Sequence, residues 1–162
     1  MAPPYATQEW LAAVAKVYRS NPKNKETFKA ISMEICFKIA AEPRLGIEKD
    51  LHFNLKVEAG ELLETRLVTA EEAQKATLLM GASYDTWKKV LTKKERFVTD
   101  FISKKITLEK GDFAKAFALG PVADSLVNIM TEEGIAWPDE MSPDELEAYK
   151  AKVKAFRQKL GV

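Results

Sequence analysis

The sequence predicts an α+β protein in which a five-stranded, mostly antiparallel sheet is covered by helices on one face. Residues 31–39 and 51–57 alternate apolar and polar side chains with a period of two, as strands with one buried face do. Segments before and after them space apolar residues as helices do. Strands buried on both faces would instead read as continuous apolar runs. The alternation therefore favours two layers, with the other face of the sheet exposed to water.

The chain begins with a predicted helix of about three turns. Thr7 is its cap, apolar residues recur at helical spacing from Trp10 to Tyr18, and Ser20-Asn21-Pro22 ends it. Residues 23–29 form one more turn or a short helix. The two alternating strands follow, separated by a connection over residues 43–50.

Three more strands complete the predicted sheet. Ala59-Gly60 is a turn that joins the second strand to a partner over residues 62–68 in a hairpin. Residues 69–74 are polar and form a helical turn. Apolar residues over 76–80 mark the fourth strand, and a short fifth strand runs over residues 105–109.

Four short helical segments accompany the last two strands. One carries Tyr84 and Trp87 three residues apart, and the next carries Phe97 and Phe101 four residues apart. Gly111-Asp112 opens a third, over residues 113–119. Gly120-Pro121 then separates it from a fourth, over residues 122–130, because glycine ends helices and proline starts them.

Residues 132–162 are predicted to be a linker and an amphipathic helix appended to a domain of residues 1–131. Trp137 is expected to pack the linker against the rest of the domain. Ser142 is followed by a proline and, three residues after the cap, by a glutamate, which marks a helix start. Apolar residues at spacings of three and four form one stripe on this helix. The stripe is expected to dock on the domain or to pair with a second copy as a homodimer; a basic helix of this kind also suits an anionic membrane surface.

Composition excludes several classes of function. The chain of 162 residues has 25 basic and 24 acidic side chains, so no excess positive charge favours nucleic acid as a partner. No apolar run is long enough for stable insertion into a membrane. The start has neither the basic nor the apolar region of a secretion signal. The lone cysteine, Cys36, suits a reducing compartment, and we expect a cytoplasmic protein.

Groups that carry out catalysis are sparse. The one histidine, His52, and Cys36 both lie on polar faces of predicted strands, where we expect solvated or edge-packed side chains. Metal binding by this pair would need further ligands that no spacing supplies. The pairs Glu71-Glu72 and Glu132-Glu133 are predicted to lie in exposed turns. We therefore expect no catalytic residue, no metal, no cofactor and no enzymatic activity.

Two motifs in the second half resemble the sterol carrier protein type-2 domain, a lipid-binding family. The first is the aromatic helix Tyr84-Asp85-Thr86-Trp87 after the fourth strand. The second is the segment from Ser103 to Asp112, which ends in Lys110-Gly111-Asp112. It departs from the family pattern at Ser103, usually glycine, and at Lys105, usually apolar. The resemblance covers residues 10–131.

The resemblance implies an apolar tunnel between the sheet and the helices. Composition alone cannot separate a hollow interior from a filled core, and the bare pattern is compatible with both. Under the resemblance, the ligand-binding residues are expected to be Met80, Trp87, Val90, Leu91, Phe97, Phe101, Ile102, Phe113 and Phe117.

The expected function is reversible binding, and transfer, of a hydrophobic small molecule without catalysis. Sterols, fatty acids, fatty acyl-CoA and isoprenoids are all compatible with an apolar pocket. Two alternatives stay open. One is an interaction or dimerisation module with a filled core, and the other is an accessory domain that presents a lipid to an enzyme.

Overall fold

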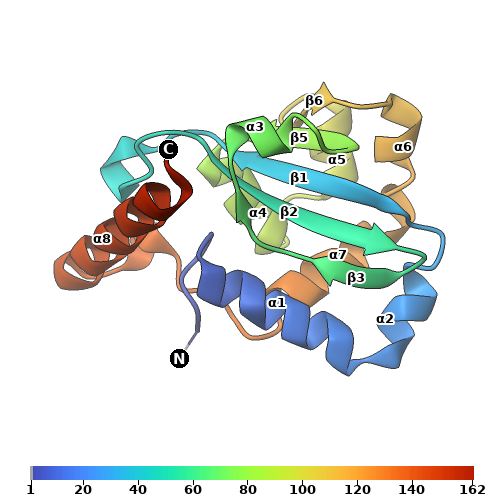
Figure 1. The fold of residues 1–162 in the computed structure, drawn as a ribbon, viewed down its shortest axis with the longest axis horizontal. Helices are drawn as coiled ribbons and strands as arrows, with labels where there is room; N and C mark the ends of the chain where they lie inside the picture. Colours follow the sequence, from blue (N-terminus) through green and yellow to red (C-terminus); the bar gives the residue numbers. More distant parts are fainter. Residues whose placement is uncertain (1) are drawn as a thin grey trace.

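The structure, a computed structural model, describes residues 2–162 and consists of one sheet with helices packed around it (Figure 1). The strands are β1 (Met33–Ile39), β2 (Leu51–Glu58), β3 (Glu61–Glu64), β4 (Leu67–Val68), β5 (Leu78–Ala82) and β6 (Thr107–Lys110). The α-helices are α1 (Gln8–Ser20), α2 (Pro22–Thr27), α3 (Ala70–Ala73), α4 (Tyr84–Leu91), α5 (Phe97–Ile102), α6 (Phe113–Phe117), α7 (Gly120–Thr131) and α8 (Pro143–Leu160). Single 3₁₀ turns span Pro43–Leu45 and Pro138–Glu140.

The sheet has the strand order β3-β2-β1-β5-β6, and β4 pairs with the other end of β2. Every neighbouring pair is antiparallel except β1 and β5, which run parallel. The predicted α+β class and mostly antiparallel sheet are therefore confirmed. The sheet has six strands rather than five, because the segment predicted as one strand over residues 62–68 divides into β3 and β4.

The division has a local cause at Asn54 in β2. Its amide group donates hydrogen bonds to Glu34 at 2.8 Å and Glu64 at 2.7 Å, and its side-chain oxygen accepts one from the backbone N–H of Arg66 at 2.8 Å. Between β3 and β4, the Asn54 side chain thus binds the backbone of Arg66 in the neighbouring segment. The β2–β3 register shifts between Lys56 and Val57. Asn54 is fully buried, and these bonds satisfy its amide.

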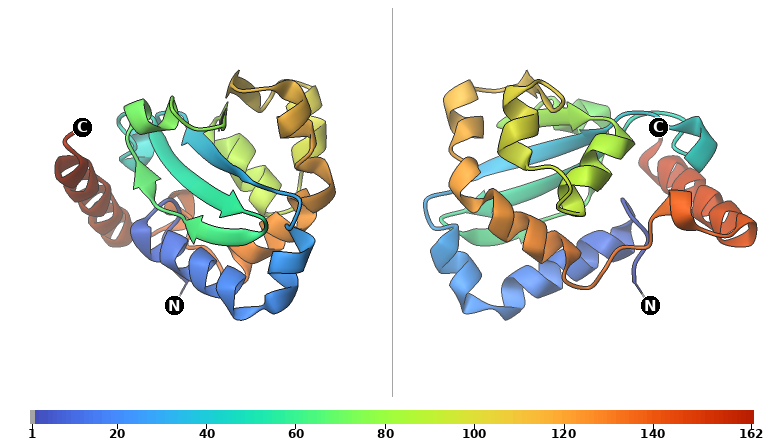
Figure 2. Two further views of the ribbon diagram at one scale, coloured as in Figure 1. Left: turned by 45° about the vertical axis from the view of Figure 1, so that its right-hand side comes forward. Right: turned by 180° about the vertical axis from the view of Figure 1, so that it is seen from behind.

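The inner face of the sheet carries its largest apolar side chains. Phe37 of β1 lies opposite Phe53 of β2 on one side and Met80 of β5 on the other. Figure 2 shows α4, α5 and α7 packed behind this face, while α1 runs along the β3 edge. The helices cover these side chains because strand alternation places all three on the same side of the sheet.

The outer face is partly covered, which corrects the expectation of a wet face. A small second cluster joins Cys36 and Leu79 on the sheet to Val68, Ala73 and Ala76 in and beside α3. The thiol of Cys36 is 1 % exposed, and burial raises its pKa to about 12.

His52 is likewise buried rather than solvated. Its side chain is 7 % exposed, and β4 pairs with β2 at this residue. Burial lowers the pKa of the imidazole. The expectation of solvated or edge-packed side chains at His52 and Cys36 was wrong because β4 and α3 cover residues that the alternation alone leaves exposed.

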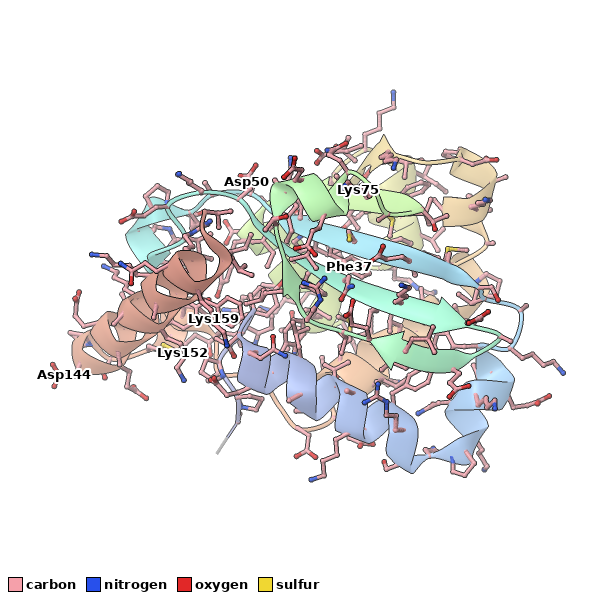
Figure 3. All side chains as sticks on the ribbon, in the orientation of Figure 1. Phe37, Asp50, Lys75, Asp144, Lys152 and Lys159 are labelled. Carbon is pink, nitrogen blue, oxygen red and sulfur yellow. The ribbon has the colours of Figure 1, made fainter. Side chains whose placement is uncertain are left out.

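The C-terminal helix α8 packs against the N-terminal part of the same chain. The Tyr149 hydroxyl donates to the backbone oxygen of Tyr5 at 2.8 Å. Lys152 lies beside the first turn of α1, where it pairs with Glu9 at 2.6 Å (Figure 3). Trp137, in the preceding linker, packs on the Tyr5 ring at a tilt of 38°, with centroids 4.7 Å apart. The apolar side of α8 therefore faces the body of its own chain.

Replacing Asn54 by alanine should destabilise the fold. The change leaves the Arg66 N–H and the oxygens of Glu34 and Glu64 without their partner, and such buried losses cost about 1–3 kcal/mol. Chemical denaturation measures the free energy of unfolding. Lys56→Ala, at an exposed position of the same strand, is the matched control and should change it by less than about 0.5 kcal/mol.

Acid should weaken the attachment of α3 to the outer face. A side-chain hydrogen bond from Arg66, supported by the Thr69 cap, lowers the pKa of Glu72 from 4.5 to about 2. Because the folded pKa is depressed, this stabilisation is complete above pH 4.5 and is lost as the pH falls from 4.5 towards 2.

The effect is small because both side chains are partly exposed, and we expect it to stay below about 1 kcal/mol. Glu72→Gln should lower stability at neutral pH and flatten the decline in stability between these pH values. Unfolding curves of the two proteins across this range provide the measurement, and identical pH profiles would contradict the role of the pair.

Candidate functional site

An apolar cavity of about 50 Å³ lies between the inner face of the sheet and the helices behind it. Fourteen residues from the N-terminal segment, three strands and three helices line it: Tyr5, Phe37, Phe53, Met80, Trp87, Val90, Leu91, Phe97, Leu119, Val122, Ala123, Leu126, Val127 and Met130. The structure therefore has a small apolar void, rather than an open tunnel, where the resemblance implies a tunnel.

The sheet and α4 form one side of this cavity. Phe37 and Phe53 stack with ring centroids 5.0 Å apart, and the Trp87 ring meets Phe37 edge to face at 5.6 Å. The Trp87 indole N–H donates to the backbone oxygen of Lys38 at 2.8 Å, which fixes the ring to β1. The cap at Ser83 starts α4 directly after β5, so Trp87 lies one helical turn from the strand end.

Helix α7 covers the opposite side. It contributes Val122, Ala123, Leu126, Val127 and Met130 to the lining. Its C-terminal part is attached to α1, because the indole N–H of Trp10 donates to the backbone oxygen of Met130 at 2.9 Å. At its other end it begins at Gly120-Pro121 with no side-chain cap.

A second apolar void, of about 20 Å³, continues the first along the sheet. It shares Leu119 and Leu126 with the larger cavity and extends between α1, β1, β2 and β3 towards Phe28. The two voids are therefore separated mainly by side chains of α7 and of the residue before it. Together they mark an apolar seam under α7.

The lining offers contact surface rather than reactive groups. Tyr5 and Trp87 are the two lining residues with an O–H or N–H group in their side chains. Burial raises the pKa of the Tyr5 phenol well above its usual value, so the group stays neutral. Within residues 2–162, no cluster of three or more His, Cys, Asp or Glu side chains is placed to hold a metal ion.

Five of the nine residues predicted to bind ligand lie in the cavity wall. Met80 comes from β5, Trp87, Val90 and Leu91 from α4, and Phe97 from the start of α5. The helical spacing of the α4 residues, three and four apart, places them on one face. That face is the one turned to the sheet.

The other four predicted residues lie outside the cavity. Phe101 is buried, but its ring packs between Phe97 and Phe113 at 5.9 and 5.2 Å instead of lining the cavity. Ile102, Phe113 and Phe117 are 60, 57 and 49 % exposed, contrary to the expectation of inward-facing aromatic side chains.

The short helix α6 explains the error at Phe113 and Phe117. Its buried face is set by Ala116, with Leu119 just beyond the helix end. At about 100° per residue, Phe113 and Phe117 lie roughly 90° and 130° around the helix from that face. The prediction assumed that the face with the largest apolar side chains is buried. The helix instead buries the face that carries the small Ala116.

Nine of the lining residues were not predicted, among them Leu119 just before α7. Phe37 and Phe53 lie on the apolar faces of the alternating strands, and that alternation was a usable signal. The apolar stripe of 122–130 was another signal for the five residues of α7. Tyr5 had none, because it reaches the cavity from an irregular segment held by Ala136 and Tyr149.

Comparisons with known proteins identify the fold through structure alone. No protein-family model matches the chain, and no curated protein matches its sequence. The structure is similar to a crystal structure of sterol carrier protein 2, with a TM-score of 0.71 and 19 % identity over 82 % of this chain and 99 % of that one. It is equally similar to a conserved protein of Thermus thermophilus described as possibly a sterol carrier protein, with a TM-score of 0.70 and 19 % identity over 84 % and 97 %.

A more distant similarity is to palmitated SCP2L2 from Aedes aegypti, with a TM-score of 0.50 and 14 % identity over 72 % of this chain and 94 % of that one. These matches define the class: the chain has the sterol carrier protein 2 fold. The resemblance found in the two sequence motifs is thereby confirmed at the level of the fold. In the part of the chain that the structure describes, no helix is long and apolar enough to cross a membrane.

Leu126→Ala should merge the two voids into one larger apolar cavity. Leu126 lines both voids and is half-buried, so we expect a loss of about 1–3 kcal/mol, near the lower end for Leu→Ala in a core. Denaturant unfolding measures this loss, and benzene binding tests the enlarged cavity. Leu63→Ala on β3, where the side chain is 43 % exposed, is the control. An unchanged stability for Leu126→Ala would contradict the position of Leu126 between the voids.

Proposed function

We propose that this protein binds one fatty acyl chain, or a lipid with a similar apolar tail, between the inner face of the sheet and α7. The observation that carries the proposal is the fourteen-residue lining, whose side chains are almost wholly apolar. Support comes from the shared fold with sterol carrier protein 2 and from the palmitated state of the Aedes aegypti protein. We further propose that the lipid is carried in the cytoplasm and transferred without chemical change.

The cavity must expand to hold such a ligand. Ligand pockets usually measure about 300–1,000 Å³, and the larger void has about 50 Å³. The second void continues along the same seam, so an acyl chain that separates α7 from the sheet would occupy both. The proposal therefore requires that this seam opens as the ligand enters.

The attachment of α7 indicates which end moves. Met130, near its C-terminus, is held by Trp10, and the other end begins at Gly120-Pro121 without a side-chain cap. An ion pair between Arg96 and Asp124 bridges α7 to the start of α5 at 3.0 Å, but both side chains are about three-quarters exposed. Exposed pairs contribute little, so the N-terminal half of α7 is the half that we expect to open.

The C-terminal extension belongs to the site in this proposal. Tyr5 lines the cavity, and its backbone is held by Ala136 at 3.1 Å and by the Tyr149 hydroxyl of α8 at 2.8 Å. We propose that residues 1–131 form the binding domain and that residues 132–162 hold Tyr5 in its wall. The apolar side of α8 then packs against its own chain. A homodimer through this helix would therefore lack the apolar contact surface that we expected it to use.

Simple energetics agree with reversible binding. Burying a methylene group contributes about 0.8 kcal/mol, so twelve methylenes contribute about 10 kcal/mol. Association itself costs about 4–15 kcal/mol. The small net value suits a carrier that must release its ligand. Selectivity among tails is low, because one methylene changes binding by only about 1–3 kcal/mol.

Ala123→Leu should block the proposed site. Ala123 lines the cavity on α7, and the larger side chain would occupy the volume that the ligand needs. The affinity for cis-parinaric acid, a fluorescent fatty acid, should fall at least tenfold, while overpacking destabilises the fold by about 1–3 kcal/mol. Ala151→Leu, an exposed position on α8, is the control and should change neither quantity. Unchanged probe affinity in a folded Ala123→Leu protein would place the site elsewhere.

A filled-core interaction module is the second candidate, and the small volume of the void favours it. Native mass spectrometry of the purified protein separates the two. Adducts of lipid mass support the carrier, whereas a doubled protein mass without adducts supports the module. An accessory role, in which the lipid is presented to an enzyme, would add an enzyme partner to the first result.

A further inference from the structure

The apolar patch opposite α8 suggests how the protein meets the source of its lipid. Ile102, Phe113 and Phe117 are three of the five large apolar side chains that the structure exposes most, and they lie on or next to α5 and α6. Figure 1 places α6 at one end of the molecule and α8 at the other. Large apolar side chains gathered on a surface indicate contact with another apolar surface.

The patch is connected to the cavity by a row of rings. Phe117 stacks on Phe113 at 5.7 Å, Phe113 packs on Phe101 at 5.2 Å, and Phe101 stacks on Phe97 at 5.9 Å. Phe97 lines the cavity. The row therefore runs from exposed side chains to the proposed binding site.

The chain segment that carries most of the patch is basic. Residues 93–117 hold seven Lys or Arg and four Asp or Glu, whereas the whole chain holds 25 and 24. Among residues 2–162, neither Lys104 nor Lys115 has an acidic partner within ion-pair distance. Lys104 also has a left-handed backbone, with φ of 66°, a conformation that favours glycine.

Several of the acidic groups in this segment are already engaged. Glu95 pairs with Lys105 at 2.9 Å, and Glu109 pairs with Lys38 at 2.7 Å on the sheet. Asp112 caps α6 by accepting a hydrogen bond from the backbone N–H of Ala114 at 2.8 Å. Asp100 is buried at 2 % exposure. The remaining positive charge complements a negatively charged surface.

We propose that the patch formed by Ile102, Phe113 and Phe117, with Lys104 and Lys115, docks on an anionic lipid membrane. Apolar rings would enter the boundary between headgroups and acyl chains, and the lysines would face the headgroups. Docking would place the row of phenylalanines between the bilayer and the cavity. This inference extends the proposed function to the lipid's source, but its test does not require that the cavity binds lipid.

Vesicle flotation tests the proposal. Wild type should float with vesicles of phosphatidylcholine containing about one third phosphatidylserine, bind pure phosphatidylcholine vesicles much more weakly, and dissociate at high salt. Phe113→Gln/Phe117→Gln should lower partitioning at least tenfold. Lys104→Gly removes one charge and relieves the left-handed backbone, so it should raise stability yet lower partitioning about fivefold. A purely structural role for Lys104 would not produce this opposite pair of effects.

Two controls match these variants. Leu63→Gln changes an exposed apolar residue on β3, and Lys154→Glu/Lys159→Glu reverses charge on α8; neither should alter flotation. The proposal is overturned if wild type does not bind anionic vesicles, if only the α8 variant loses binding, or if the patch instead holds a dimer that Phe113→Gln/Phe117→Gln dissociates. Binding of cis-parinaric acid, measured separately, distinguishes failure of membrane docking from failure of lipid binding in the cavity. Vesicle binding without probe binding would refute the proposed function and leave this inference standing.

Discussion

Phe53, Phe37 and Met80 form a row of large apolar side chains across three neighbouring strands, and the arrangement of the helices follows from the need to bury this row. Side chains of this size on one face of a sheet must be removed from water, and a sheet alone cannot do so. Helices α1, α4, α5 and α7 provide the cover. The cavity is a consequence of how α7 meets this row, because the helix and the aromatic side chains leave a narrow apolar seam between them.

The opposite face is organised by polar contacts. Asn54 is buried in the sheet and joins two carboxylates to the backbone at Arg66, while Arg66 continues to Glu72 in α3. These bonds hold β4 and α3 over residues that would otherwise be exposed. The two faces thus differ: the inner face is held together by apolar packing, whereas the outer face combines a small apolar cluster with directional hydrogen bonds that fix the strands.

The predicted residues that lie in the cavity wall are those for which helical periodicity and strand alternation agreed. Trp87, Val90 and Leu91 share a helix face, and Met80 shares a strand face with its apolar neighbours. The prediction failed on α6, where five residues are too few to define a stripe and the buried face carries an alanine. The two phenylalanines there are exposed and lie outside the cavity wall.

Sequence patterns were enough to predict the fold class, the order and approximate limits of the elements, the resemblance to the sterol carrier fold and the α4 residues of the cavity wall. All of these depend on local periodicity or on residues close together in the chain. Sequence patterns did not predict the small volume of the cavity, the burial of His52 and Cys36, the division of the third strand, or the place of Tyr5 in the cavity wall. Each of these depends on contacts between residues distant in sequence, such as Asn54 with Glu34 or Tyr149 with Tyr5, and no local pattern encodes them.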